Sequence, residues 1–129
     1  MERQDFIGWI DAYERAWRTP GTAALEELFR SDATYVAAPF DSSVQGRAAI
    51  QTFWEAERES ADEAFTLTRE VIAVEGDVGV ARIEVRYGTP PTRVYRDLWI
   101  ITLDSGGRCV AFEEWPFFPG QQRSAINSP

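Results

Sequence analysis

Apolar positions recur every three or four residues in much of the first half of the chain, which is the spacing of amphipathic helices. This spacing predicts a first helix from Asp5 to Trp17, with Tyr13 on its buried side. The break at Thr19-Pro20-Gly21 ends that helix, and a second, short helix is expected over about Thr22 to Phe29. A third helix is expected from Arg47 to about Arg58.

The other periodic segments carry the pattern of β-strands, whose side chains point to opposite faces in turn. The expected strands are Ala33 to Ala38, Phe65 to Val74, Val78 to Tyr87, Arg93 to Leu103 and Arg108 to Phe118. Short turn-forming connections join the last four strands, so these four form an antiparallel meander. Helices placed before a sheet predict an α+β fold with the helices on one face.

The chain length of 129 residues is that of one domain with a sizeable core. No internal repeat or linker divides it. We therefore expect a single domain over residues 1–119, followed by a polar C-terminal tail over residues 120–129.

A carboxylate interrupts the apolar strand predicted from Arg93 to Leu103. Alternation places Asp97 on the same face as Tyr95 and Trp99, whereas Arg96 points to the opposite face and cannot neutralise it from within the strand. Two interpretations remain open. Asp97 is a pocket acid whose pKa is raised by desolvation, or it forms a buried ion pair with an arginine nearby, namely Arg82, Arg86 or Arg93.

The opposite face of this strand is also apolar, with Val94, Leu98 and Ile100. If the helices cover the other face, these side chains favour packing of the sheet's outer side on a second copy of the chain, as a homodimer. The alternative is that the termini or the loop after Tyr87 cover this face.

Composition and charge exclude several classes of function. The net charge is −8 and basic residues are not clustered, so we expect no nucleic-acid partner. All thirteen cationic residues are arginine, which removes lysine Schiff bases, histidine-based triads and imidazole metal ligands. One cysteine, Cys109, excludes an intrachain disulfide. We expect no metal, no cofactor, no membrane association and a cytoplasmic location, since neither a leader nor a membrane-length apolar run is present.

The order of elements and several short motifs resemble the nuclear transport factor 2-like superfamily, also called SnoaL-like. The matching residues, between about residues 5 and 118, are Tyr13, Leu28-Phe29, Asp32-Ala33-Thr34, Gly46-Arg47-x-x-Ile50-x-x-Phe53 and Leu67-Thr68-x-Glu70-Val71-x-Ala73-Val74. The resemblance implies a cone-shaped α+β fold, with about three N-terminal helices packed on the concave face of a curved, mainly antiparallel sheet. It also implies a conical pocket and a dimer through the convex face of the sheet, which is common in this superfamily.

Within the superfamily the chain looks most similar to ketosteroid isomerase-type members. That resemblance implies that Tyr13 and Asp97 bind a developing enolate oxygen. In enzymes of that type an apolar site keeps a carboxylic acid neutral, so that the acid can donate a hydrogen bond. The position of the family's catalytic base corresponds to Ala37 or Ala38 here, so that base is missing.

Two other acids are candidates to move the proton, and each has an ordinary structural alternative. Asp41 lies in the loop after Pro39, where an aspartate is common as a turn residue. Glu113 and its neighbour Glu114 point to opposite faces of the last strand, and the sequence does not decide which one faces the pocket. A pair made of Asp97 and one of these glutamates is a possible acid–base couple, and a glutamate paired with an arginine is the alternative.

The aromatic residues suggest what the pocket holds. Most of them belong to the core, but five tryptophans in one small domain favour an apolar ligand pocket. The expected substrate-binding residues are Trp17, Tyr35, Phe53, Trp54, Tyr95, Trp99 and Trp115. The chain is expected to bind a small, largely apolar or aromatic molecule. Two functions are open. The chain is a cofactor-independent isomerase, cyclase or dehydratase of ketosteroid isomerase-like or polyketide cyclase-like type that works through an enolate, or it is a non-catalytic ligand-binding or dimerisation module.

Overall fold

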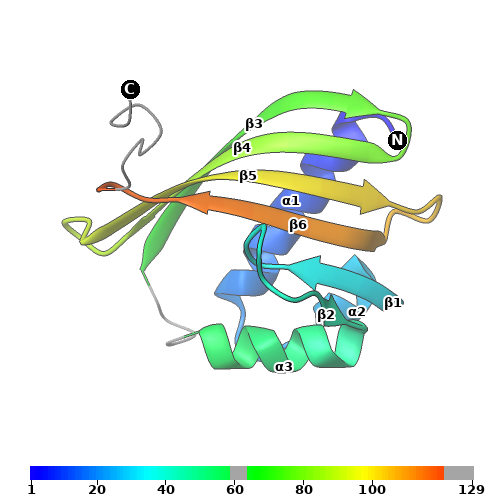
Figure 1. Cartoon of the computed structure of the whole chain (residues 1–129), viewed down its shortest axis with the longest axis horizontal. Helices are drawn as coiled ribbons and strands as arrows, with labels where there is room; N and C mark the ends of the chain where they lie inside the picture. The colour runs from blue at the N-terminus through cyan, green and yellow to red at the C-terminus, as the bar shows by residue number, and fades with distance from the viewer. Residues whose placement is uncertain (59–63, 121–129) are drawn as a thin grey trace.

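A computed structural model, which describes residues 1–58 and 64–120, places three helices against a curved six-stranded sheet (Figure 1). The helices are α1 (Arg3–Arg18), α2 (Leu25–Leu28) and α3 (Arg47–Glu57). The strands are β1 (Phe29–Val36), β2 (Val44–Gln45), β3 (Phe65–Glu75), β4 (Val78–Tyr87), β5 (Arg93–Leu103) and β6 (Cys109–Phe117). The predicted α+β cone fold is confirmed.

The strands follow the order β2-β1-β6-β5-β4-β3 across the sheet. Every neighbouring pair is antiparallel except β1 and β6, which run parallel. The last four strands form the predicted meander, and β1 joins it beside the final strand. This parallel contact brings the first strand next to β6, so residues far apart in the sequence share one wall.

The first half of the chain departs from the sequence prediction in three places. Strand β1 begins at Phe29, earlier than expected, because its first polar residues are exposed and hide the strand pattern. Helix α2 is a single turn at Leu25–Leu28, shorter than expected, and Phe29 already belongs to strand β1. Strand β2 was not predicted, since two residues are too few to show alternation. From residue 121 on, the predicted tail lies outside the described residues.

Helix α1 packs closely on the concave face of the sheet, with the core of the protein between them. A Cβ atom at Gly79 of β4 would lie 2.6 Å from the ring of Phe6, so only glycine permits this approach. At the middle of the helix, the buried indole N–H of Trp9 donates a hydrogen bond to the carbonyl oxygen of Leu28, at 3.0 Å. These contacts fix the position of α1 and therefore of Tyr13, which lies one turn further along.

Strand β5 separates two different faces, as alternation predicts. Asp97 and Trp99 are buried beneath the helices, whereas Leu98 and Ile100 lie half-buried on the outer side. The register of β5 with β6 places Trp115 beside Leu98 on that outer side. Trp115 and Phe117 are 37% and 47% exposed, so the outer face carries large apolar side chains in contact with solvent.

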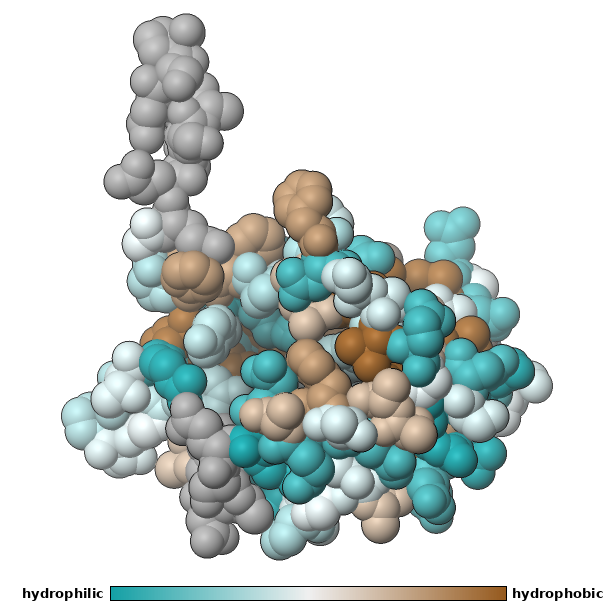
Figure 2. Space-filling view, turned by 60° about the horizontal axis from the view of Figure 1, so that its bottom comes forward, coloured by the Kyte–Doolittle hydropathy of each residue, from teal (hydrophilic) through white to brown (hydrophobic). Residues whose placement is uncertain are grey.

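The face that carries α3 is less apolar than the outer face of the sheet. Apolar side chains are scattered among polar ones there, as Figure 2 shows with this helix turned toward the viewer. Within the two described ranges, no helix combines the length and the apolar character needed to cross a membrane.

Candidate functional site

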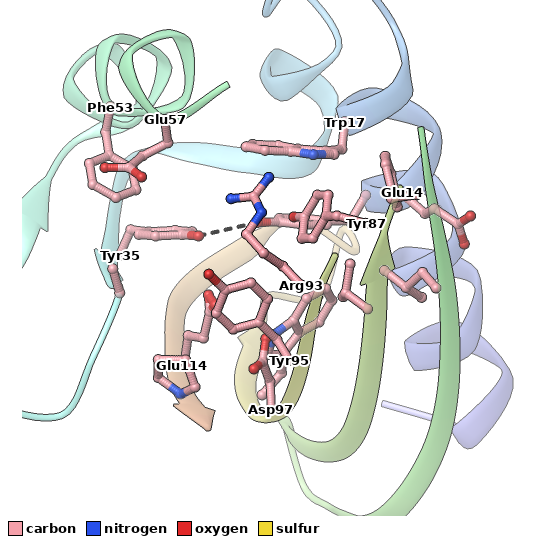
Figure 3. A pocket seen from close by; sticks show the side chains of 17 residues that line it. Glu14, Trp17, Tyr35, Phe53, Glu57, Tyr87, Arg93, Tyr95, Asp97 and Glu114 are labelled. Carbon is pink, nitrogen blue, oxygen red and sulfur yellow. Dashed lines mark hydrogen bonds between the residues drawn. The ribbon is translucent and has the colours of Figure 1, made fainter. Parts of the chain in front are cut away.

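A pocket of about 300 Å³ opens between α1, α3 and the concave face of the sheet (Figure 3). Aromatic rings supply much of its wall, and the charged groups are four carboxyls and one guanidinium. The lining residues are Tyr13, Glu14, Trp17, Tyr35, Ala37, Phe53, Glu57, Phe65, Leu67, Val85, Tyr87, Arg93, Tyr95, Asp97, Trp99, Glu114 and Pro116.

Three stacked rings hold the wall between α1 and the sheet. The ring of Phe112 lies between those of Tyr13 and Tyr35, with centroid distances of 5.3 Å and 4.7 Å and nearly parallel planes. The register of β1 with β6 explains one of these contacts, because Tyr35 and Phe112 are direct partners across the parallel strands. Tyr13 and Tyr35 are therefore held at fixed positions by packing.

The hydroxyl groups of these tyrosines meet inside the pocket. The Tyr13 and Tyr35 oxygens are 3.2 Å apart in a buried hydrogen bond, drawn as a dashed line in Figure 3. Burial raises the pKa of each phenol well above its ordinary value, and the nearby Glu114 carboxyl raises both further. Both tyrosines thus remain protonated at neutral pH. Only one of the two protons is used in their mutual hydrogen bond, so the other can be donated to a ligand.

Two carboxyl groups face the same space from adjacent strands. Asp97 of β5 is 6% exposed, and Glu114 of β6 is half-buried. Burial is the main cause that raises the pKa of Asp97 to about 6 and that of Glu114 to about 8. The Asp97 charge and a hydrogen bond between the two groups also raise the pKa of Glu114. Between these values the pair holds one proton, mainly on Glu114.

The geometry does not favour the ion-pair interpretation of Asp97. Arg82 bonds to Glu70 at 2.6 Å and Arg86 bonds to Glu84 at 3.0 Å, both on the outer side of the sheet. An arginine partner would lower the pKa of a carboxyl, whereas that of Asp97 is raised. The Tyr13 hydroxyl bonds to Tyr35, so a direct hydrogen bond between Tyr13 and Asp97 is not the arrangement found.

Four candidate residues lie away from the pocket. Glu113 points to the outer face, where it accepts a hydrogen bond from the indole of Trp115. Trp115 itself is on that face, and Trp54 is fully buried in the core behind Trp17. Asp41 is exposed in the loop between β1 and β2. The expectation that these four residues line the pocket is therefore wrong. Glu113 and Trp115 lie on the other side of the sheet, Trp54 lies too deep in the core, and Asp41 lies in an exposed loop.

The other expected ligand-binding residues do line the pocket. They are Trp17, Tyr35, Phe53, Tyr95 and Trp99, together with Tyr13 and Asp97. Alternation alone left Glu113 and Glu114 as alternatives, and Glu114 faces the pocket. Counting residues through the β5–β6 turn could have shown which glutamate faces inward. A bulge after Thr102 defeats such a count, because a shift of one residue moves every side chain to the opposite face.

The sequence prediction missed three charged lining groups. Glu14 and Glu57 come from α1 and α3, and Arg93 comes from the start of β5. Glu14 also binds Arg18 at 2.9 Å, and the Arg93 guanidinium lies 4.7 Å from the centre of the Tyr87 ring. In the described ranges, no cluster of three or more His, Cys, Asp or Glu side chains could hold a metal ion.

Comparison with known proteins identifies related folds. A model of the SnoaL-like domain family matches residues 10–112. No curated protein matches the sequence. A candidate polyketide cyclase of Sinorhizobium meliloti has a similar structure, with 23% identity, 88% of this chain and 99% of that chain covered, and a TM-score of 0.66.

Two further solved structures show the same fold. One is the epoxide hydrolase/cyclase-like enzyme SalBIII of pyran ring formation in salinomycin, with 12% identity, 89% and 92% of the two chains covered, and a TM-score of 0.68. The other is a candidate isomerase of the SnoaL-like family from Agrobacterium tumefaciens, with 17% identity, 88% and 98% covered, and a TM-score of 0.66. At these identities the likeness concerns the fold.

Proposed function

The chain belongs to the SnoaL-like domain family, and from this membership we propose that its pocket binds a small, largely apolar or aromatic carbonyl compound and moves a proton on it without a cofactor. Isomerisation, cyclisation and dehydration are reactions of this kind. The observation that carries the proposal is the pair formed by Asp97 and Glu114, two carboxyls that line the same aromatic pocket and whose pKa values are both raised by burial.

The two carboxyls have complementary roles in this mechanism. The Asp97 carboxylate accepts a proton from the carbon next to the carbonyl group, and the Glu114 carboxyl donates a proton to the product. The proton then passes between the two groups and restores the starting state. Their pKa values of about 6 and about 8 bracket neutral pH, where a base and an acid are both efficient.

The tyrosine pair supplies the charge stabilisation. As the proton leaves carbon, negative charge develops on the ligand oxygen, and a phenol of Tyr13 or Tyr35 donates to it. A preorganised donor in a pocket with little water stabilises such a charge more than water does. In this mechanism Asp97 and Glu114 move the proton, the part first expected of Asp41 or Glu113, and Tyr13 and Tyr35 bind the oxygen, the part first expected of Tyr13 and Asp97.

The test is exchange of solvent deuterium into a panel of cyclic enones and β-keto compounds. We expect exchange to fall at least roughly a hundredfold in Asp97→Asn and Glu114→Gln, the usual contribution of a general acid or base. Glu113→Gln is the matched control, because Glu113 is the neighbouring residue on the other face. Exchange no faster than in buffer, or equal exchange in Glu114→Gln and Glu113→Gln, would refute the mechanism.

A non-catalytic, ligand-binding function is the second candidate. One observation favours it: Ala37, one of the two residues that the resemblance aligns with the family's base, lines the pocket and carries only a methyl group. A ligand that raises the melting temperature without undergoing exchange would support this function.

The outer face of the sheet supports a proposal about assembly. Leu98 lies opposite Trp115 there, and Trp115 and Phe117 are exposed beside the arginine–glutamate pairs of the same face. We propose that this face packs on a second copy of the chain to form a homodimer, with Leu98, Ile100 and Trp115 in the contact.

A further inference from the structure

Among the described residues that line the pocket, Arg93 is the one cation. It is the first residue of β5 and lies on the same inner face as Tyr95 and Asp97. Asp97 is separated from it by about 13 Å along the strand, at roughly 3.3 Å per residue. Arg93 is exposed whereas Asp97 is buried, so Arg93 lies at the mouth of the pocket and Asp97 at its inner end.

Aromatic packing holds the Arg93 side chain at the mouth. Arg93 and Tyr87 are direct partners across β5 and β4, and the guanidinium lies 4.7 Å from the centre of the Tyr87 ring. Tyr87 packs in turn on Phe65, its partner on β3, with ring centroids 5.8 Å apart. Attraction to the ring restrains the Arg93 side chain, which reaches into the pocket in Figure 3. A restrained side chain loses less rotamer freedom when it binds a ligand.

The carboxyls that the helices contribute to the lining do not cancel this positive charge. Glu14 of α1 is paired with Arg18 at 2.9 Å. Glu57, the last residue of α3, is exposed, so water and salt screen its charge. Arg18 and Arg93 together balance Glu14 and Glu57, which leaves this part of the pocket without a net charge that would repel an anion.

The carboxyls on the sheet are stabilised within the pocket wall. Burial raises the pKa of Glu114 to about 8, so Glu114 is mostly protonated at neutral pH and acts as a donor. Burial also raises the pKa of Asp97 to about 6, and hydrogen bonds from the Trp99 side chain and the Phe117 backbone oppose that rise. The remaining negative charge therefore lies on Asp97, at the opposite end of the pocket from Arg93.

The polar groups that meet a ligand at neutral pH are consequently in the main donors. The Tyr13 and Tyr35 phenols share one hydrogen bond and keep one proton to donate. Glu114 adds a carboxyl proton, and Arg93 adds guanidinium N–H groups at the mouth. A matching ligand therefore carries acceptors at two places, one at the phenols and one at the mouth.

We propose that Arg93 binds a carboxylate group of the ligand at the mouth of the pocket. A guanidinium presents several N–H donors in a planar fork that matches the two oxygens of a carboxylate, so it binds one while keeping its other contacts. This inference rests on the proposed function and names its substrate class, a keto acid. The ketone oxygen lies at Tyr13 and Tyr35, and the carboxylate lies at Arg93.

The size of the pocket is consistent with a compact keto acid. A volume of about 300 Å³ is at the lower end of the range of small-molecule sites, roughly 300–1,000 Å³. The ligand body faces rings such as Phe53 and Tyr95, so it is expected to be apolar between its two polar groups.

The experiment titrates the protein at neutral pH with 4-oxocyclohexanecarboxylate and with 4-oxocyclohexanecarboxamide, which has the same shape and no charge. Proton–nitrogen NMR spectra give the dissociation constant of each ketone. We expect the wild type to bind the carboxylate roughly tenfold more tightly, as for a hydrogen-bonded ion pair that is partly exposed to water. Added salt should reduce this preference.

Arg93→Gln should abolish the preference and leave the affinity for the carboxamide unchanged. Arg96→Gln is the matched control, because it removes the same charge from the same strand. Arg96 lies on the outer face, where it binds Glu84 at 3.0 Å, so this variant should keep the preference.

The inference is overturned if the wild type binds the carboxamide as tightly as the carboxylate, or if the carboxylate does not bind at millimolar concentration. Equal loss of the preference in Arg93→Gln and Arg96→Gln would also overturn it. A third ketone, 4-(dimethylamino)cyclohexanone, is a cation at neutral pH. If it binds more tightly than the carboxylate, the carboxyls of the lining select the ligand and the inference is wrong. The comparisons among ketones use the wild-type chain, so a folding defect in a variant does not affect them.

Failure of the proposed function is a separate result. A carboxylate preference that depends on Arg93, without deuterium exchange, would leave this subsite in place and refute proton transfer. Deuterium exchange without a carboxylate preference would do the reverse.

Discussion

Ionisation of the Asp97–Glu114 pair opposes folding, so we expect the protein to lose stability as the pH rises from about 5 to about 8.5. Folding raises the pKa of Asp97 from 3.8 to about 6 and that of Glu114 from 4.5 to about 8. The folded chain therefore binds these protons more tightly than the unfolded chain does. For an acid shifted in this direction, stability is highest below the unfolded pKa and is lost as the pH rises through the folded pKa.

The shift of Glu114 sets the magnitude. An increase from 4.5 to about 8 corresponds to roughly 5 kcal/mol at 1.36 kcal/mol per unit. This is an upper value, because Glu114 is only half-buried and solvent screens part of its charge. Domains of this size are stable by roughly 5–15 kcal/mol, so the loss is a large fraction of the total.

The perturbation that tests this is Glu114→Gln, which keeps the shape of the side chain and removes its charge. Urea unfolding followed by tryptophan fluorescence gives the free energy of unfolding at several pH values. Glu114→Gln should match the wild type near pH 4, where Glu114 is protonated in both the folded and the unfolded chain, and exceed it by up to about 5 kcal/mol near pH 8.5. Glu113→Gln, on the outer face, should follow the wild type throughout.

Other carboxyls cause the loss of stability at low pH, so that loss does not affect the comparison of Glu114→Gln with the wild type at higher pH. The pKa of Asp11 is lowered mainly by Arg69, that of Glu84 by Arg86 and Arg96, and that of Asp104 by backbone N–H groups. Their contributions are present above pH 4 and are lost as the pH falls below it. Stability that stays constant or rises between about pH 5 and about pH 8.5, or equal curves for Glu114→Gln and Glu113→Gln, would refute the reasoning.

Three further predictions concern packing, assembly and surface charge. Gly79→Ala places a methyl group 2.6 Å from the Phe6 ring, so we expect it to lower the free energy of unfolding by about 1–3 kcal/mol in urea, and Gly8→Ala, with open space around it, should be neutral or stabilising. Leu98→Arg should convert the proposed dimer to a monomer in analytical ultracentrifugation, whereas Thr52→Arg, exposed on helix α3, should not; a wild-type monomer at micromolar concentration would contradict the dimer. Asp11→Asn removes the exposed pair with Arg69, at 2.6 Å and 3.0 Å, and should cost no more than about 1 kcal/mol at pH 7 and less as the pH falls below the ordinary pKa of aspartate. A larger loss in thermal unfolding would mean that the pair does more than a surface ion pair does.

Periodicity was enough to predict the long elements because each buries one continuous side. Helix α1 and strands β4 and β5 lie within two residues of their predicted ends, since their apolar positions repeat over ten or more residues. Segments of two to four residues, such as β2 and α2, are too short to show a repeat. Alternation likewise placed Asp97 on the inner face, because that result depends on the strand alone.

The candidate site depends on contacts between strands and helices that are distant in sequence. The sequence placed Tyr13, Tyr35 and Asp97 at a pocket, but it could not show that the two phenols bond to each other, since β1 reaches α1 only through the parallel contact with β6. It also left Glu113 and Glu114 as alternatives. The register between β5 and β6, which includes a bulge, places Glu114 opposite Trp99 on the face of Asp97, and Glu113 on the outside.

The sequence by itself thus determined the element types, the fold class and the inward direction of Asp97, because these follow from local repeats. Only the tertiary structure decided which acid accompanies Asp97 and that the phenols of Tyr13 and Tyr35 bond to each other. The physical reason is that pKa values and hydrogen bonding depend on what surrounds a group in space. For Asp97 those surroundings are Trp99, two residues along the same strand, and Glu114 from the adjacent strand β6.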